Sequence, residues 1–111
     1  MNKTILIGRL TADPESKVIA NSQLSTFTLA VKRPHTDKTD FIRVNAWNGL
    51  SKIVDSYAKK GRNVLVEGYI TVSNGQRDDG SYFSYTAVSA ESIEFLESKS
   101  TVEARENAAL A

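Results

Sequence analysis

One short segment of the sequence combines aromatic and positively charged side chains at a spacing that could hold a flat, negatively charged ligand. Residues 40–47 read Asp-Phe-Ile-Arg-Val-Asn-Ala-Trp, and in a strand neighbouring side chains point to opposite faces. One face would carry Ile42, Val44 and Ala46. The other would carry Phe41, Arg43, Asn45 and Trp47. The aliphatic face suits a core, so we expect the two rings and the guanidinium on the outside, where burial within a monomer does not explain them.

Exposed rings beside an arginine favour stacking on nucleobases. Each stacked base contributes on the order of 1 to 3 kcal/mol, and every base can stack because every base has a π-face. Arg43 could pair with a phosphate or stack in its own right. The strand pattern leaves a second interpretation open, in which Phe41 and Trp47 cover a subunit interface or the end of a helix.

Positive charge is concentrated in the body of the chain. The net charge is +1, yet residues 1–90 hold 12 Lys and Arg against 8 Asp and Glu, whereas residues 91–111 hold 2 against 5. The acidic end therefore masks a basic body. Taken singly, each of these cations is more typical of a solvated surface charge, and only together do they indicate a binding groove. The candidate phosphate-binding residues are Lys3, Arg9, Lys32, Arg33, Arg43, Lys52, Arg62 and Arg77.

Most of the remaining sequence alternates apolar and polar residues with the period of strands that are buried on one face. We expect strands at residues 4–10, 24–32, 40–47, 63–72 and 82–90, with a short extension at 92–95. A further stretch near Lys17 turns at residues 21–22. A polar turn at residues 74–80 joins the last two strands.

A single segment has helical spacing instead. Apolar residues recur at the i, i+3, i+4 and i+7 positions of a helix with one buried stripe, namely Leu50, Ile53, Val54 and Tyr57. We expect Asn48 to cap the start of this helix and Gly61, in a left-handed conformation, to end it.

Three strands, a helix and two strands predict an all-β OB-fold, a five-stranded Greek-key barrel with one short helix between strands 3 and 4. We expect this domain at residues 1–97 and a short flexible or helical tail at residues 98–111. The chain of 111 residues is 41% hydrophobic and contains no cysteine, so packing must stabilise it. Its N-terminal apolar run is shorter than that of a signal peptide, and we expect a soluble cytoplasmic protein without membrane contact.

A series of motifs runs through the chain in a fixed order, from Asn-Lys-Thr-Ile-Leu-Ile-Gly-Arg-Leu at residues 2–10 and Asp-Pro at 13–14 to segments at 27–31, 41–47, 57–61, 66–68 and 86–90. This series resembles the bacterial single-stranded DNA-binding proteins. The resemblance implies binding of single-stranded DNA without sequence preference in replication, recombination or repair, with no catalysis, cofactor or metal. It also implies a homotetramer in which residues 4–8 pair between subunits.

The resemblance assigns roles to individual residues. Phe41 stands at the family's main stacking tryptophan position, and Trp47 stands at its stacking phenylalanine position. His35 stands at a loop position where relatives have an aromatic residue, and it could stack or simply be solvated. Gly75 occupies the place of a stacking tryptophan in the hairpin after the fourth strand.

Other aromatic residues in the hairpin segment could compensate for Gly75. The candidates are Tyr82, which we include among the DNA-binding residues, and its neighbours Phe83 and Tyr85. Tyr69, Phe83 and Tyr85 could instead lie in subunit contacts. Relatives also end in an acidic tip that recruits replication and repair proteins, whereas the acidic residues here are spread over residues 91–106. Recruitment through a tail is therefore not expected.

Two rival functions remain. The adjacent carboxylates Asp78 and Asp79 could hold the metal of a nuclease, but their glycine-flanked position is more typical of a solvated turn. The chain has one histidine and no phosphate-binding loop of the Gly-rich Lys-Ser/Thr kind, which argues against an enzyme. The second rival is an OB-fold accessory subunit of a primosome that binds other proteins more than DNA.

Overall fold

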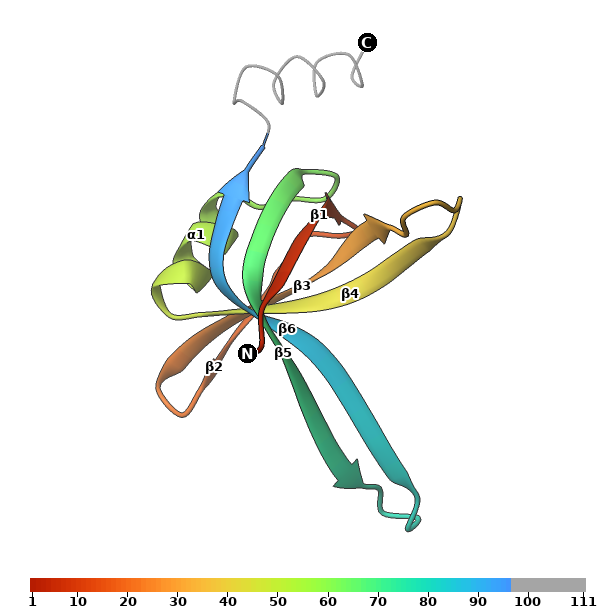
Figure 1. Cartoon of the computed structure of the whole chain (residues 1–111). Helices are drawn as coiled ribbons and strands as arrows, with labels where there is room; N and C mark the ends of the chain where they lie inside the picture. The colour runs from red at the N-terminus through yellow and green to blue at the C-terminus, as the bar shows by residue number, and fades with distance from the viewer. Residues whose placement is uncertain (97–111) are drawn as a thin grey trace.

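The computed structural model describes residues 1–96, which form six strands and one helix (Figure 1). In chain order these are β1 (Thr4–Leu10), β2 (Glu15–Ile19), β3 (Ser22–Lys32), β4 (Thr39–Trp47), α1 (Gly49–Tyr57), β5 (Asn63–Gln76) and β6 (Tyr82–Phe95). The order agrees with the one expected from the sequence. The tail predicted at residues 98–111 lies outside the described residues.

The strands close into a barrel. β1 pairs with β5, β5 with β6, β6 with β4, β4 with β3, and β3 again with β1. The contact between β4 and β6 is parallel, and the other pairings are antiparallel. A ring of five strands with a helix between its third and fourth members is the OB-fold topology, which confirms the predicted fold class.

The sixth strand arises because the first barrel strand is broken. Arg9 in β1 pairs with Ala30 of β3, and Glu15 in β2 pairs with Thr26, which lies farther along β3. β2 therefore continues β1 along β3. Pro14, which lies directly before β2, has no amide hydrogen to give to a ladder, and strands usually end or bend at such a residue.

The core confirms the predicted alternation. Phe27 and Leu29 of β3 and Val44 and Ala46 of β4 are all buried, and the strands opposite contribute Val64, Val66 and Val88. Burying an aliphatic or aromatic side chain of this size stabilises a fold by about 1.5 to 3 kcal/mol. The inward face of each strand is thus held by packing, and the outward face is available for binding.

The predicted stripe of α1 is partly wrong. Val54 is buried, but Ile53 and Tyr57 are exposed, and the other buried positions on the helix and just after it are Ser51 and Ala58. These three buried positions still have helical spacing, displaced around the helix from the predicted stripe. Ser51 faces β3, where a hydrogen bond between its hydroxyl and that of Ser25 replaces part of the apolar contact.

Both ends of α1 differ from the prediction. Asn48 makes no side-chain cap, and its Oδ1 accepts the backbone N–H of Gln23 instead at 3.2 Å. The helix ends at Tyr57, before Gly61 is reached. Gly61 does adopt a left-handed conformation with a φ of 83°, as predicted, but it serves the turn that leads into β5.

β5 and β6 extend past the barrel as a long hairpin (Figure 1). Their ladder reaches the pair of Gln76 and Tyr82. Gly75 is therefore a strand residue opposite Phe83, whereas the sequence predicted that it lies in the turn. The turn itself comprises residues 77–81. The two strands run beyond the predicted end at residue 72 because cross-strand pairs, rather than propensity at residues 73–76, decide where a hairpin stops.

Candidate nucleic-acid interface

The outward residues of β4 are exposed as the sequence predicted. Phe41 is 68% exposed and Trp47 is 38% exposed, and Arg43 between them also faces solvent. We call Phe41, Arg43, Asn45 and Trp47 the β4 outer face. Neither ring is sealed inside the barrel, so intramolecular burial does not account for them.

Small side chains on β3 lie beside this face. Ala30 is directly opposite Phe41, and Thr28 is directly opposite Arg43. Residues opposite each other in an antiparallel pair share one face of the sheet. Since methyl and hydroxyl groups are much shorter than a ring or a guanidinium, the β4 residues stand above a low floor formed by β3.

Arg9 borders the same floor from the far side. It is opposite Ala30 on β1, so Arg9, Ala30 and Phe41 form one row across three strands. One guanidinium nitrogen of Arg9 donates to the carbonyl of Gly61 at 3.0 Å. The row therefore places a positive group two strands away from an exposed ring.

Arg43 connects the barrel to the hairpin. Its guanidinium carbon lies 5.2 Å from the centre of the Tyr85 ring on β6, within the range of a cation–π contact. Asn45 pairs with Ser89 in the parallel ladder, and side chains alternate along β6. Tyr85 and Phe83 consequently lie on the same side of the sheet as the β4 outer face.

An ion pair shapes the loop between β3 and β4. The Arg33 guanidinium binds both carboxylate oxygens of Asp40, at 2.6 and 3.1 Å. This hydrogen bond holds the pKa of Asp40 below its usual value and raises that of Arg33. The backbone N–H of Arg33 also donates to the carbonyl of Lys38 at 2.9 Å, which closes the loop that carries His35.

The eight predicted phosphate partners do not all gather in one place. Lys3 lies 3.8 Å from a carboxylate oxygen of Glu67. Arg62 packs 4.5 Å from the centre of the Phe95 ring and donates to the carbonyl of Tyr57 at 2.6 Å. Arg62 is thereby part of the packing at the end of the barrel. Lys52 is exposed on α1, and Arg77 lies in the hairpin turn after β5. Lys32 ends β3 and Arg33 follows it in the loop, whereas Arg43 lies on β4 and Arg9 on β1.

The hairpin aromatics divide between two faces. Tyr82 pairs with Gln76, one step along from the pair of Phe83 and Gly75. Neighbouring pairs point to opposite sides, so Tyr82 faces away from the side that Phe83 and Tyr85 share with β4. The sequence predicts Tyr82 as a DNA-binding residue from its type and position alone, since only the cross-strand register assigns each ring to a face of the hairpin.

One of the two adjacent carboxylates at the hairpin turn, Asp79, has a structural role. Asp79 Oδ1 accepts the backbone N–H of Ser81 at 2.9 Å and the Ser81 hydroxyl at 2.6 Å, which lowers the pKa of Asp79. Within residues 1–96, no cluster of three His, Cys, Asp or Glu side chains could hold a metal ion. Over the same residues, no helix combines the length and apolar character needed to cross a membrane.

Fold and surface together define the class: this is an OB-fold protein whose outer face presents aromatic rings and guanidinium groups. The comparison with protein families adds the family itself. The model of the single-strand binding protein family matches residues 1–96, and the chain belongs to that family.

Individual relatives are similar over most of the chain. Single-stranded DNA-binding protein 3 of Listeria innocua is 39% identical over 105 residues, which are 89% of this chain and 66% of the relative. Single-stranded DNA-binding protein A of Bacillus subtilis is 37% identical, over 89% of this chain and 61% of the relative. Single-stranded DNA-binding protein 2 of Clostridium acetobutylicum is 42% identical, over 87% of this chain and 77% of the relative. The chain thus matches 66% or less of the length of the first two.

Proposed function

We propose that this protein binds single-stranded DNA without sequence preference and without catalysis, and protects it during replication, recombination or repair. The observation that carries the proposal is the exposure of Phe41 and Trp47 on either side of Arg43 along one strand face. Bases stacked on these rings would be held whatever their identity. The names of the relatives, which describe binding of single-stranded DNA, support the same conclusion.

Phosphates would be held by the cations nearest to the rings. Arg43 and Arg9 border the low floor of β3, and Lys32 ends that strand. Arg33 and His35 in the adjoining loop would form the rim of the same surface, with Lys52 on α1 as a further contact. Each phosphate neutralised releases condensed cations from the strand, which makes binding weaken with salt.

The proposed assembly is a homotetramer, and the proposed location is the bacterial cytoplasm at the nucleoid. Residues 4–8 of β1 pair with β5 along one edge, and their other edge has no pairing strand among residues 1–96. Ile5 and Ile7 are both more than half exposed on that strand. An open edge beside exposed aliphatic side chains favours pairing with a second copy.

The decisive experiment is a comparison of binding to single-stranded and duplex oligonucleotides of matched sequence over a range of salt concentrations. We expect strong binding of oligo-dT and of mixed single strands, weak binding of the duplex, and quenching of the fluorescence of Trp47, the only tryptophan. Equal affinity for both forms would contradict stacking. No binding to either form, with unchanged Trp47 fluorescence, would favour an OB-fold subunit that binds other proteins.

A further inference from the structure

Trp47 is held differently from the other ring of the β4 outer face. It is the last residue of β4 and is less exposed than Phe41. Leu24, directly opposite on β3, is only 6% exposed, although Thr26 on the same side of that strand is partly exposed. Leu24 also lies outside the apolar cluster that fills the barrel. It is therefore covered from the outer side, and the indole directly opposite is placed to cover it.

The residue after Trp47 has a backbone conformation that side chains rarely adopt. Asn48 has a φ of 53° and a ψ of −118°. Asparagine tolerates positive φ in the left-handed helical region, where ψ is about +30 to +60°. The angles of Asn48 lie outside that region and match the first central position of a type II′ turn, which favours glycine. Asparagine at this position therefore strains the backbone.

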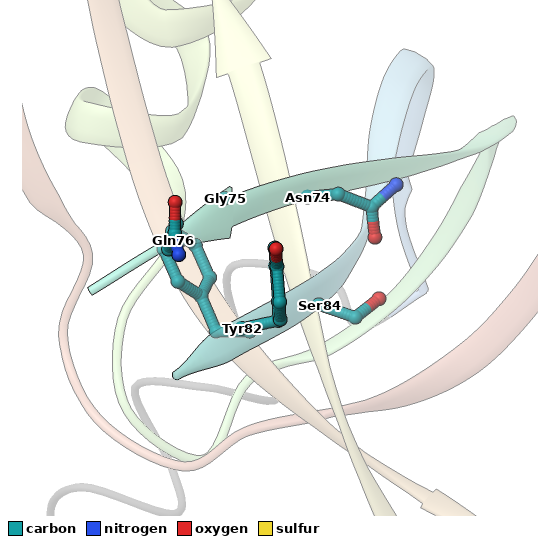
Figure 2. Close-up of a pocket in the computed structure, with 6 residues that line it drawn as sticks. Asn74, Gly75, Gln76, Tyr82 and Ser84 are labelled. Atoms are coloured by element: carbon teal, nitrogen blue, oxygen red, sulfur yellow. The ribbon is translucent and has the colours of Figure 1, made fainter. Parts of the chain in front are cut away.

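Glycine stands elsewhere in the chain where the backbone requires it. Gly75, labelled on β5 in Figure 2, is such a position, because a side-chain carbon there would overlap the Phe83 ring. Beside Asn48 the order is reversed. Gly49 is not at positive φ, and a side-chain carbon on it would meet no atom within 4 Å. A side chain kept where the backbone favours glycine points to a role for that side chain.

Asn48 is fastened to β3 by two hydrogen bonds to a single residue. Its backbone N–H donates to the carbonyl of Gln23 at 2.8 Å, and its Oδ1 accepts the backbone N–H of Gln23 at 3.2 Å. The side-chain carbonyl thus takes the place of a backbone carbonyl. It extends the pairing of β3 with β4 by one residue past the pair of Leu24 and Trp47. Glycine or alanine at position 48 would lose this second bond.

The same corner of the molecule is tied to α1. The carbonyl of Asn48 accepts the backbone N–H of Lys52 at 3.2 Å, and Nε2 of Gln23 donates to Oδ2 of Asp55 at 3.1 Å. Trp47 therefore lies between a strand pair and a residue that is fixed from both β3 and α1. The direction in which its side chain leaves the backbone is thereby set before a ligand arrives.

We propose that Asn48 is a positioning residue for DNA binding, which holds the end of β4 through its paired hydrogen bonds with Gln23 so that the Trp47 ring is oriented to stack on a base. The inference rests on the proposed function, since it concerns how one of the stacking rings is held. A ring that is already oriented strengthens binding because it does not have to be ordered when the strand arrives.

The first test uses Asn48→Gly, because glycine accepts this backbone conformation but lacks the Oδ1 acceptor. We expect the variant to fold and its affinity for oligo-dT to fall about threefold or more, a part of the loss expected when a stacked base is removed. Asn21→Gly is the matched control, since Asn21 is also an asparagine at positive φ but lies in the turn between β2 and β3. Unchanged affinity of Asn48→Gly would overturn the proposal and leave the proposed function intact.

A second comparison shows whether Asn48 acts through Trp47. In a Trp47→Ala background, Asn48→Gly should cause no further loss of affinity, because no ring is left to orient. An equal loss in both backgrounds would contradict the proposal, since Asn48 would then act independently of the ring. So would a Trp47→Ala protein that binds oligo-dT as tightly as the unmodified protein. Failure of the unmodified protein to bind oligo-dT would overturn the proposed function, and this inference with it.

The third measurement needs no DNA. Trp47 is the only tryptophan, so time-resolved fluorescence anisotropy of the free protein reports the motion of this one indole. We expect a larger fast decay for Asn48→Gly than for the unmodified protein and Asn21→Gly, with the same assembly state for all three by sedimentation. Identical decays would refute the proposal, because the ring would then be held equally well without the Asn48 side chain.

Discussion

The hydroxyl oxygens of Ser25 and Ser51 lie 2.6 Å apart inside the contact between β3 and α1. Both residues are fully buried, and the Ser25 hydroxyl also contacts a carboxylate oxygen of Asp55. Asp55 in turn accepts hydrogen bonds from Ser16 at 2.6 Å and from Gln23 at 3.1 Å. A short helix with few buried apolar residues is therefore fixed to the barrel, and to the β2–β3 hairpin, by a polar network.

The network predicts a non-additive effect on stability. Ser25→Ala is expected to lower the free energy of unfolding by about 1 to 3 kcal/mol, because it leaves the buried hydroxyl of Ser51 without its partner. Ser25→Ala combined with Ser51→Ala should destabilise the protein by less than the two single changes together, since no orphaned hydroxyl remains. Chemical denaturation measures all three, and strictly additive losses would contradict a coupled pair.

The ion pair between Arg33 and Asp40 predicts that the stability of the fold depends on pH in the acidic range. The pKa of Asp40 is lower in the folded protein than its usual value of 3.8, chiefly because Arg33 donates a hydrogen bond to it. Its stabilising effect is therefore complete above about pH 4 and is lost as the pH falls through the lowered pKa. Because the pair is exposed, we expect only a small effect.

The measurement is the thermal midpoint of unfolding between pH 7 and pH 2.5. Asp40→Asn should lower the thermal midpoint slightly at pH 7. As the pH is lowered, the midpoint of this variant should fall less than that of the unmodified protein. Asp37→Asn, which removes a carboxylate from the same loop but not the Arg33 pair, serves as the control. Parallel curves for Asp40→Asn and the unmodified protein would show that the pair contributes nothing.

Alternation was a reliable guide to the strands and to the β4 outer face. Val44 and Ala46 are buried and Phe41 is exposed because a strand with one aliphatic side has only one way to face a core. The buried face of the helix was harder to predict, because its contact with β3 uses Ser51. The apolar stripe in the sequence consists of other residues, namely Leu50, Ile53, Val54 and Tyr57. A buried hydrogen bond between two serines leaves no signal in hydrophobic periodicity.

The position of the hairpin aromatics could not be obtained from the sequence. Three aromatic residues at 82, 83 and 85 alternate over two faces, and only the register of Gly75 with Phe83 decides which face meets β4. The phosphate partners were likewise chosen by type and approximate position. Arg62 illustrates the limit, because its packing against Phe95 depends on a contact between residues far apart in the chain.

The open edge of β1 predicts a change in assembly. Ile5→Lys places a charge on the exposed apolar side of that strand, and we expect it to shift the protein from a tetramer to smaller species at micromolar concentrations. Val18→Lys is the matched control, because Val18 is also an exposed aliphatic residue but lies on β2. Sedimentation velocity distinguishes the species. A stable monomer for the unmodified protein would contradict the proposed tetramer.

Arg43 predicts a change in salt dependence. If its guanidinium neutralises one phosphate, Arg43→Gln should reduce the slope of log affinity against log salt by about 0.7, the value for one contact to a single strand. Lys59→Gln removes an exposed positive charge near the end of α1 and should leave the slope unchanged. An unchanged slope together with weaker binding would instead show that Arg43 acts by stacking or by orienting Tyr85.

Phe41 predicts a loss that is the same for every sequence. Phe41→Ala should weaken binding of single strands by about 1 to 3 kcal/mol, since it removes one stacked base without removing any hydrogen bond to a base edge. Titrations with oligo-dT, oligo-dA and a mixed sequence measure this loss. Tyr57→Ala, which removes an exposed ring from α1, is the control and should bind normally. A loss confined to one oligonucleotide would mean that Phe41 reads base identity, and stacking alone would no longer explain the β4 outer face.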